Sequence, residues 1–190
     1  MNLEKQKEKF KNHIAKFTDY GNIKILDFKN PESNHYRIRF LFEEDYCRLH
    51  ISGDLGELIA TNYYNMTFNK FGDFANNTGY FEEKVDCHNR PFYYYDLKAA
   101  REELTEYFKD SYLLDEEEIE DVLDDILLDF SDDRGISGKG YDALLEIDSE
   151  GWEYVYNVGK KRTVILDVYM LAFKLATEQL KGETYEEVSS

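Results

Sequence analysis

HYRIRFLFEEDYCRLHIS, residues 35–52, is the stretch that decides the fold. In its first half the apolar side chains of Ile38, Phe40 and Phe42 alternate with Arg37, Arg39 and Leu41, which is the period of a β-strand with one buried face. The second half repeats the alternation after the short break at EED. A connection this short joins only antiparallel neighbours, so we expect a strand pair here.

Similar alternating runs lie on both sides of this pair, and the breaks between them are rich in turn residues such as KNPESN and GDLG. Short connections of this kind indicate an antiparallel meander. Before it, residues 3–19 have the spacing of an amphipathic helix that Gly21 would end. The four expected strands are residues 22–28, 35–43, 46–52 and 57–64.

Beyond the strands the sequence becomes helical. The run FYYY at 92–95 favours an extended form, and the last helix is apolar on most faces and should be buried. The expected helices are 67–76, 96–110, 115–130, 141–147, 150–158 and 162–181. The sequence therefore predicts an α+β fold, with an N-terminal helix and a four-stranded antiparallel meander followed by a helical, strongly acidic C-terminal half. We expect an α/β region at 1–95 and an acidic helical region at 96–190, packed on the first as one unit.

Composition bounds the cellular setting. Two cysteines in 190 residues are too few for a disulfide framework and suit a reducing compartment. The sequence has neither a signal-peptide pattern at its start nor an apolar run long enough to span a bilayer. We therefore expect a cytoplasmic protein with no membrane partner.

The net charge of −17 is confined to one part of the chain. Residues 102–153 carry 20 acidic side chains against Lys109, Arg134 and Lys139, while the segments before and after them are each neutral. A charge that served general solubility would be spread over the whole chain. The placement instead indicates a local acidic surface.

The helix expected at 115–130 would present that surface. Its apolar residues are spaced three and one apart, which places them in one stripe along a helix. The stripe would dock the helix and leave its carboxylates exposed, and the loop after it adds two more acids. The apolar stripe is Ile119, Val122, Leu123, Ile126, Leu127 and Phe130. The expected partner-binding residues are Glu117, Glu118, Asp121, Asp124, Asp125, Asp129, Asp132 and Asp133.

Catalytic and metal motifs are weak by comparison. We assign no catalytic residue, no metal ligand and no cofactor, so the chain is not expected to be an enzyme. DFSDDRGISGKG, residues 129–140, lacks the Gly and Glu of a calcium loop and the Gly and Ser/Thr of a phosphate loop. A metal-dependent nuclease using Asp124, Asp125 and Asp129 stays open as an alternative, although a helix does not provide the converging geometry that such a site needs.

The sheet offers a second alternative. Arg37, Arg39 and Arg48 should share its wetter face, and arginine beside aromatic side chains can bind single-stranded RNA. Ion pairing with neighbouring acids is the simpler interpretation of these residues. The role of Tyr93, Tyr94 and Tyr95 stays open, although an interface would suit them.

The runs YRIRFLFEEDYCRLHISGDLGELIATNYYNMTFNKFGDFANNTGYFEEKVDC (36–87) and ILDVYMLAFKLATEQL (165–180) resemble a family of small acidic proteins of phages and mobile elements of Gram-positive bacteria. Some of these proteins are anti-CRISPR inhibitors of type II effector nucleases. The resemblance implies a partner with a long basic channel, with or without its guide RNA. Together with the segregated charge, it predicts a non-enzymatic inhibitor in the host cytoplasm that contacts a basic protein surface rather than nucleic acid. The alternative is a protein that acts on guide RNA through the arginines.

Overall fold

A computed structural model describes residues 3–64, 66–112 and 114–188. The chain divides into two compact units. Unit 1 is residues 1–91 and 164–190, and unit 2 is residues 92–163. Unit 2 is thus inserted into the sequence of unit 1. The last helix of the chain belongs to unit 1, where it packs on the sheet.

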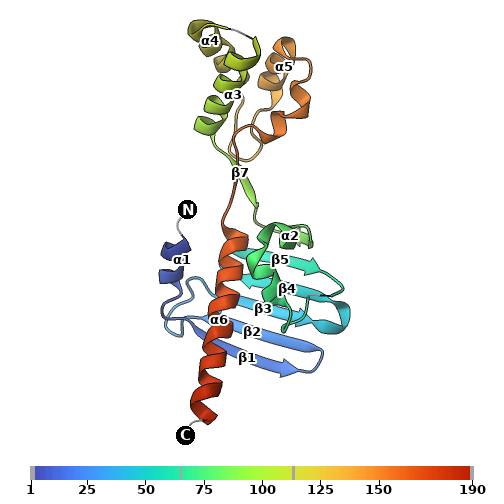
Figure 1. Ribbon diagram of the computed structural model, residues 1–190, viewed down its shortest axis with the longest axis vertical. Coiled ribbons are helices and arrows are strands. Elements are labelled where there is room, and N and C mark those ends of the chain that lie inside the picture. Colours follow the sequence, from blue (N-terminus) through green and yellow to red (C-terminus); the bar gives the residue numbers. More distant parts are fainter. Residues whose placement is uncertain (1–2, 65, 113, 189–190) are drawn as a thin grey trace. The chain divides into compact units, whose positions relative to one another are not determined.

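Unit 1 is built on a six-stranded antiparallel sheet whose strands lie in the order of the chain (Figure 1). The expected strands 22–28, 35–43, 46–52 and 57–64 are confirmed as β2 to β5. The register places Leu26, Phe40, Ile51 and Leu58 in one row across these four strands, and all four side chains are buried. The strands are β1 (Ile14–Tyr20), β2 (Ile23–Lys29), β3 (Ile38–Glu43), β4 (Arg48–Gly53), β5 (Gly56–Thr61) and β6 (Val85–His88).

The buried face of this sheet is covered mainly by helix α6 (Ile165–Val188), with α2 (Thr78–Glu82) and the 3₁₀ segment η2 (Phe71–Asn76) beside it (Figure 1). The ring of Phe173 on α6 lies 5.4 Å from Phe40 and 4.8 Å from Phe71, in edge-on contacts. The expected burial of the last helix is confirmed. Its partner is the sheet.

The expected helix over 3–19 is wrong beyond its first turns. Helix α1 ends at Lys9 (Leu3–Lys9), and β1 pairs along its whole length with β2. Phe10 is buried as expected, but Ile14 is 51% exposed because it faces away from the covered side of the sheet. Gly21 forms the tight turn between β1 and β2, where its φ of +79° favours glycine.

Unit 2 is mostly helical. Its two short strands pair with each other, and the backbone N–H of Thr163 donates to the carbonyl of Phe92 at 2.7 Å, so the chain enters and leaves the unit side by side. The helices expected at 96–110, 115–130 and 141–147 are present, although the second ends at Ile126, four residues early, whereas 150–158 forms two 3₁₀ turns. The elements are β7 (Tyr93–Tyr95), α3 (Leu97–Tyr112), α4 (Glu116–Ile126), α5 (Gly138–Ile147), η3 (Gly151–Glu153), η4 (Val155–Asn157) and β8 (Lys160–Arg162).

Taken together, the two units form the α+β class that the sequence predicts, with two strands more in the main sheet than expected. Among the described residues, no helix has the length and apolar character needed to cross a membrane.

Candidate functional site

Helix α4 is held in unit 2 by its apolar stripe. Ile119, Leu123 and Ile126 are at most 1% exposed and pack into one cluster with side chains of α3, α5 and η4. At the N-terminus Asp115 accepts from the backbone N–H groups of Glu117 and Glu118, and the Glu118 carboxylate accepts from the N–H of Asp115. This capping box fixes where the helix begins. The expected docking of the stripe is confirmed.

The acids of α4 form two rows with different surroundings. One row, Glu116, Glu120 and Asp124, faces basic side chains of α3. Arg101 donates to Glu120 at 2.6 Å and to Asp124 at 2.7 Å, and Lys109 lies 3.7 Å from Glu116. This paired row is partly neutralised by the molecule itself.

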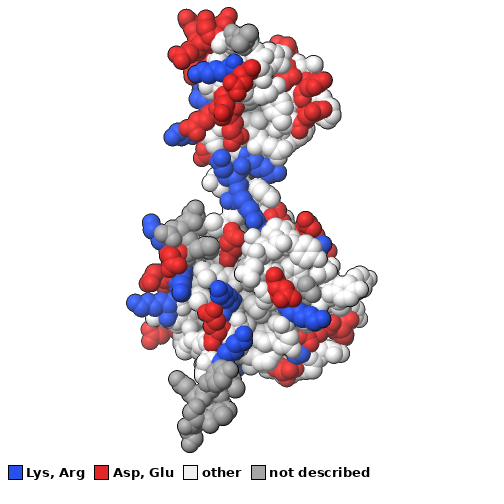
Figure 2. Space-filling view, viewed as in Figure 1, with Lys and Arg blue, Asp and Glu red and all other residues white. Residues whose placement is uncertain are grey.

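The other row is Glu117, Asp121 and Asp125, spaced four residues apart along the helix. All three are exposed, and none has a cationic partner among the described residues. We call these three residues the open row. Figure 2 shows acidic side chains gathered over the part of unit 2 that carries α4. Like charges at this spacing repel, so the helix keeps them at a local cost in stability.

The loop after α4 adds carboxylates with mixed roles. Asp132 is exposed and its side chain has no partner among the described residues. Asp129 Oδ2 accepts from the backbone N–H of Lys139 at 2.9 Å and so caps the start of α5. Asp133 lies 3.6 Å from the guanidinium of Arg134, its neighbour in sequence.

All eight acids expected to bind a partner are therefore exposed in the structure. Glu117, Asp121, Asp125 and Asp132 are open, whereas Asp124 and Asp133 have basic neighbours, and Glu118 and Asp129 serve as caps. The role of the eight in binding stays a prediction.

On the sheet, the three arginines of the RNA alternative each have a carboxylate neighbour. Arg39 donates two hydrogen bonds to Asp27, at 2.7 and 3.0 Å. Arg37 lies 3.6 Å from Asp54, and Arg48 lies 3.7 Å from Glu43. Phosphate groups would have to compete with these carboxylates, so the geometry gives the RNA alternative no added support.

The described part of the chain has no cluster of metal ligands. No three His, Cys, Asp or Glu side chains there converge as metal ligands would. Two of the three acids of the nuclease alternative already have other partners. Asp124 binds Arg101, and Asp129 caps α5.

Sequence reasoning missed one polar cluster of unit 2. Asp148 is 7% exposed and accepts hydrogen bonds from the hydroxyls of Tyr107, at 2.6 Å, and Tyr154, at 3.0 Å. Burial acts to raise the pKa of Asp148, but these bonds and one from the backbone N–H of Glu150 outweigh it, and the pKa is lowered. The cluster ties α3 to the segment after α5. Its members are 41 and 6 residues apart in sequence, in a region crowded with acids, so no local pattern marks it.

Comparison with known proteins finds no matching family model, no matching curated protein and no matching solved structure.

Proposed function

We propose that this protein is a non-enzymatic inhibitor that uses the open row of α4, with Asp132, to occupy a basic nucleic-acid-binding surface of another protein. One observation carries the proposal: a helix docked firmly by an apolar stripe keeps three carboxylates in line, and none of the three has a cationic partner in the part of the chain that the structure describes. A fold gains no stability from such a row. The row does provide a field that attracts a basic partner and accelerates association.

The charge density of α4 falls below that of duplex DNA. Helix α4 has 11 residues and therefore spans about 16 Å, and it carries seven acids. That is about one acid per 2.4 Å, but three of the seven face Arg101 and Lys109. The other four give about one charge per 4 Å, against about one per 1.7 Å of axis in duplex DNA. A groove built for nucleic acid would meet a sparser line of negative charge on this helix.

The partner class we propose is a host defence nuclease, with the type II CRISPR effector as the first candidate. Such an enzyme holds its guide–target duplex in a long positively charged channel and recognises it through the backbone. The resemblance of 36–87 and 165–180 to small acidic proteins of phages and mobile elements leads to the same candidate. Binding there would block entry of nucleic acid without any chemical step.

The test compares two variants with the same change in net charge. The first, the face variant, neutralises the open row and Asp132: it carries Glu117→Gln, Asp121→Asn, Asp125→Asn and Asp132→Asn. The control variant neutralises four exposed acids of unit 1, Glu8, Glu32, Asp73 and Asp86, to Gln or Asn. Binding to a purified type II effector, with and without guide RNA, is measured at two salt concentrations, together with cleavage of target DNA.

We expect the face variant to bind at least about tenfold more weakly, with a smaller salt dependence, and to lose inhibition, because long-range attraction is removed at the contact. The control variant should bind and inhibit as the unchanged protein does. If both variants lost binding and inhibition equally, the effect would come from the overall charge of the protein and not from the open row. Absence of binding by the unchanged protein would rule out this partner.

A further inference from the structure

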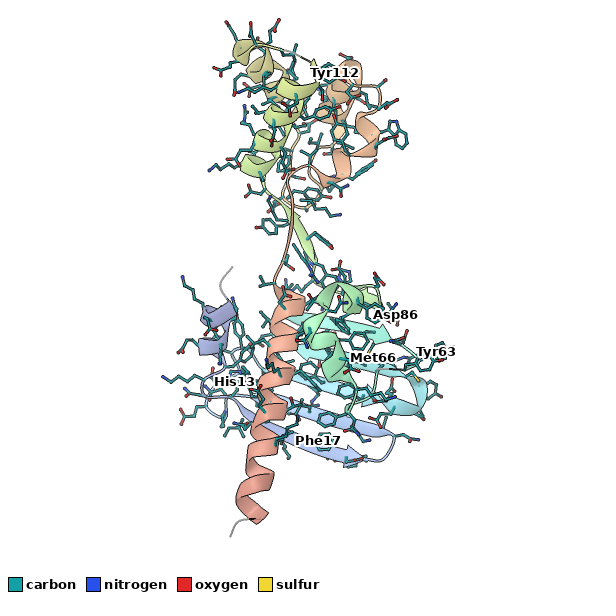
Figure 3. The ribbon with its side chains drawn as sticks, in the orientation of Figure 1. His13, Phe17, Tyr63, Met66, Asp86 and Tyr112 are labelled. Atoms are coloured by element: carbon teal, nitrogen blue, oxygen red, sulfur yellow. The ribbon has the colours of Figure 1, made fainter. Side chains whose placement is uncertain are left out.

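The loops at one end of the sheet of unit 1 carry a second surface. Because the sheet is an antiparallel meander, the β1–β2 turn, the β3–β4 connection and the chain leaving β5 all lie at the same end. Each of these three segments holds tyrosine: Tyr20, Tyr46, and the pair Tyr63 and Tyr64. Figure 3 shows Tyr63 projecting beyond the sheet at this end.

These tyrosines are unusually exposed. Tyr63 is 87% exposed, Tyr64 77%, Tyr20 69% and Tyr46 68%, which are the highest values among the exposed large hydrophobic side chains of the described residues. Single exposed apolar residues need no explanation, but the four highest values fall on adjacent loops. Tyrosine supplies large contact area at little cost in side-chain entropy, and it is enriched in the cores of protein interfaces.

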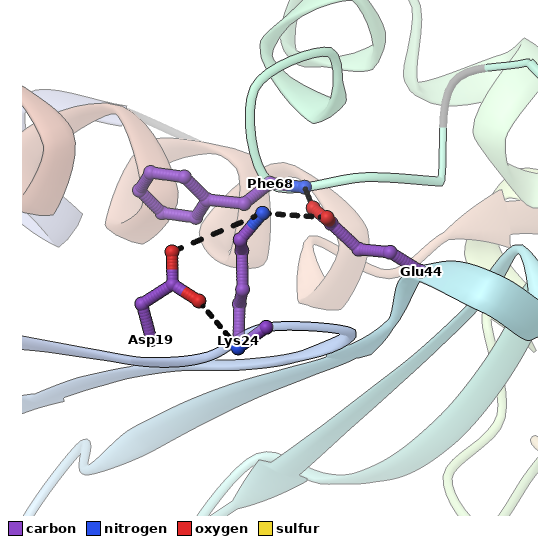
Figure 4. A network of polar contacts seen from close by, with 5 residues as sticks. Asp19, Lys24, Glu44 and Phe68 are labelled. Atoms are coloured by element: carbon purple, nitrogen blue, oxygen red, sulfur yellow. Dashed lines mark hydrogen bonds and ion pairs between the residues drawn. The ribbon is translucent and has the colours of Figure 1, made fainter.

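Glu44 fastens these loops together (Figure 4). Its backbone N–H donates to the carbonyl of Asn22 in the β1–β2 turn at 2.8 Å, and its carboxylate accepts from Lys24 at 2.6 Å. The other carboxylate oxygen accepts from the backbone N–H of Phe68 at 2.9 Å. One residue thus joins the β1–β2 turn, the β3–β4 connection and the segment that follows β5. The backbone of the two loops next to Tyr20 and Tyr46 is held by this network.

Cys47 connects the β3–β4 connection to the segment that carries Tyr63 and Tyr64. It has a φ of +51°, so the chain reverses sharply just after Tyr46. Its carbonyl accepts from the N–H of Asn62 at 3.1 Å, and its thiol lies 3.5 Å from the carbonyl oxygen of Tyr63. The loops that carry Tyr46 and Tyr63 are therefore tied to each other. A preorganised surface of this kind has little ordering entropy to lose on binding.

The charges around the tyrosines favour a positively charged partner over a phosphate group. Three cations of these strands and loops are already engaged: Lys24 with Glu44 at 2.6 Å, Arg48 with Glu43 at 3.7 Å, and Lys84 with Glu83 at 3.7 Å. A phosphate would find no unpaired cation among these three. Asp45, between Glu44 and Tyr46, is exposed and its carboxylate has no partner among the described residues.

The chain already contains two contacts between a cation and the face of a tyrosine ring. The guanidinium of Arg48 lies 5.7 Å from the ring centroid of Tyr46, and the ammonium of Lys84 lies 4.4 Å from that of Tyr80. Tyrosine faces attract cations, and a planar guanidinium can also pair with a carboxylate. We propose that Tyr20, Tyr46, Tyr63 and Tyr64, with Asp45, form a docking surface for an arginine-bearing segment of another protein. This surface lies on unit 1 and does not depend on the function proposed for α4.

The test uses the full-length protein labelled with 3-fluorotyrosine, with each ¹⁹F signal assigned by Tyr→Phe substitution. The probe is the peptide Ac-Gly-Arg-Gly-Arg-Gly-NH₂, and its neutral match carries citrulline in place of arginine. Tyr156 is the reference, since it is 62% exposed but lies in unit 2. We expect the arginine peptide to shift the four loop signals about threefold more than the Tyr156 signal, with no such shift from the citrulline peptide. Asp45→Asn should weaken the binding about fivefold.

Two outcomes would overturn the proposal. Shifts of equal size at Tyr156 and at the loops would mean that the peptide follows overall charge only. Larger shifts from a ten-residue oligothymidylate than from the arginine peptide would make the surface a nucleic-acid site instead.

Tyr63→Ser with Tyr64→Ser, which removes exposed rings only, should abolish the peptide response while the thermal unfolding temperature stays unchanged.

Discussion

Arg101 on α3 and Asp124 on α4 are joined by an ion pair in which Nη2 donates to Oδ1 at 2.7 Å. The same guanidinium donates to Glu120 at 2.6 Å. The hydrogen bond with Asp124 and the nearby Glu120 charge raise the pKa of Arg101, so the guanidinium stays positively charged at neutral pH. Arg101 therefore divides the acids of α4 into a paired row and an open row.

Replacing Arg101 by Gln should have opposite effects on stability and binding. The ion pairs are solvent-exposed, so their loss should lower the free energy of unfolding by less than about 1 kcal/mol. Binding to a basic partner should become tighter, because Glu120 and Asp124 are no longer neutralised. Urea unfolding and affinity for the candidate nuclease measure the two effects. Lys98→Gln, which removes a pair with Glu102 on α3, is the control. Weaker binding by the Arg101 variant would contradict the division into rows.

Gly140 of α5 packs directly against the backbone of α4. It is buried, and a Cβ atom at this position would overlap the backbone carbonyl of Ile126. Backbone atoms cannot move aside as a flexible side chain can, so Gly140→Ala should destabilise unit 2 by about 1–3 kcal/mol or more. Gly72→Ala is the matched control, since its added Cβ meets open space. Urea unfolding followed by the fluorescence of Trp152, the only tryptophan, reports on unit 2 directly. An unchanged midpoint for Gly140→Ala would show that the helices can separate freely.

The Asp148 cluster should make unit 2 sensitive to acid. Because the pKa of Asp148 is lower in the folded state than in the unfolded chain, its contribution to stability is present above the unfolded pKa of about 4 and is lost as the pH falls through the folded value. Asp148→Asn leaves the tyrosine hydroxyls with a weaker acceptor and should cost about 1–3 kcal/mol at pH 7.

Unfolding of both proteins by urea between pH 7 and pH 3, followed by Trp152 fluorescence, tests this linkage. The difference in stability between the unchanged protein and the Asn variant should shrink as the pH falls below about 4. A difference that stays constant across this range would mean that the Asp148 carboxylate is not the group that titrates.

Sequence periodicity predicted β2 to β5 because alternation and short turns agree there. It failed for β1, where Phe10, Ile14 and Phe17 are also spaced as on a helix. Pairing with β2 decided the outcome, and that pairing is not visible in a local window. The edge strand β6 of the main sheet is short, mostly exposed and joined through a register shift at Ile59 and Ala60, so it has no clear period.

The candidate site was predictable to a similar extent. The apolar stripe of α4 indicates which side of the helix faces solvent, because that side depends only on spacing within the helix. The division of the exposed acids into two rows depends on Arg101, which is 19 residues from Glu120 and 23 from Asp124 in sequence. A tertiary contact of this kind leaves no trace in local periodicity.

Asp121 and Asp124 allow the sharpest test of the two rows, because they lie three residues apart on one helix. Asp121 has Glu117 and Asp125 one turn away on either side, so Asp121→Asn removes two like-charge pairs and should raise the free energy of unfolding by about 0.4–1 kcal/mol. Asp124→Asn removes the pair with Arg101 as well as some repulsion, so it should leave the protein no more stable than before.

Binding to a basic partner should follow the opposite order. Asp121→Asn should weaken it severalfold, whereas Asp124→Asn should change it less, because the charge of Asp124 is already partly cancelled by Arg101. Urea unfolding and affinity at low salt give both quantities for each variant. A helix residue whose removal stabilises the fold and weakens binding is one that serves the partner rather than the fold. If Asp121→Asn left binding unchanged, the open row would be only a solvated face.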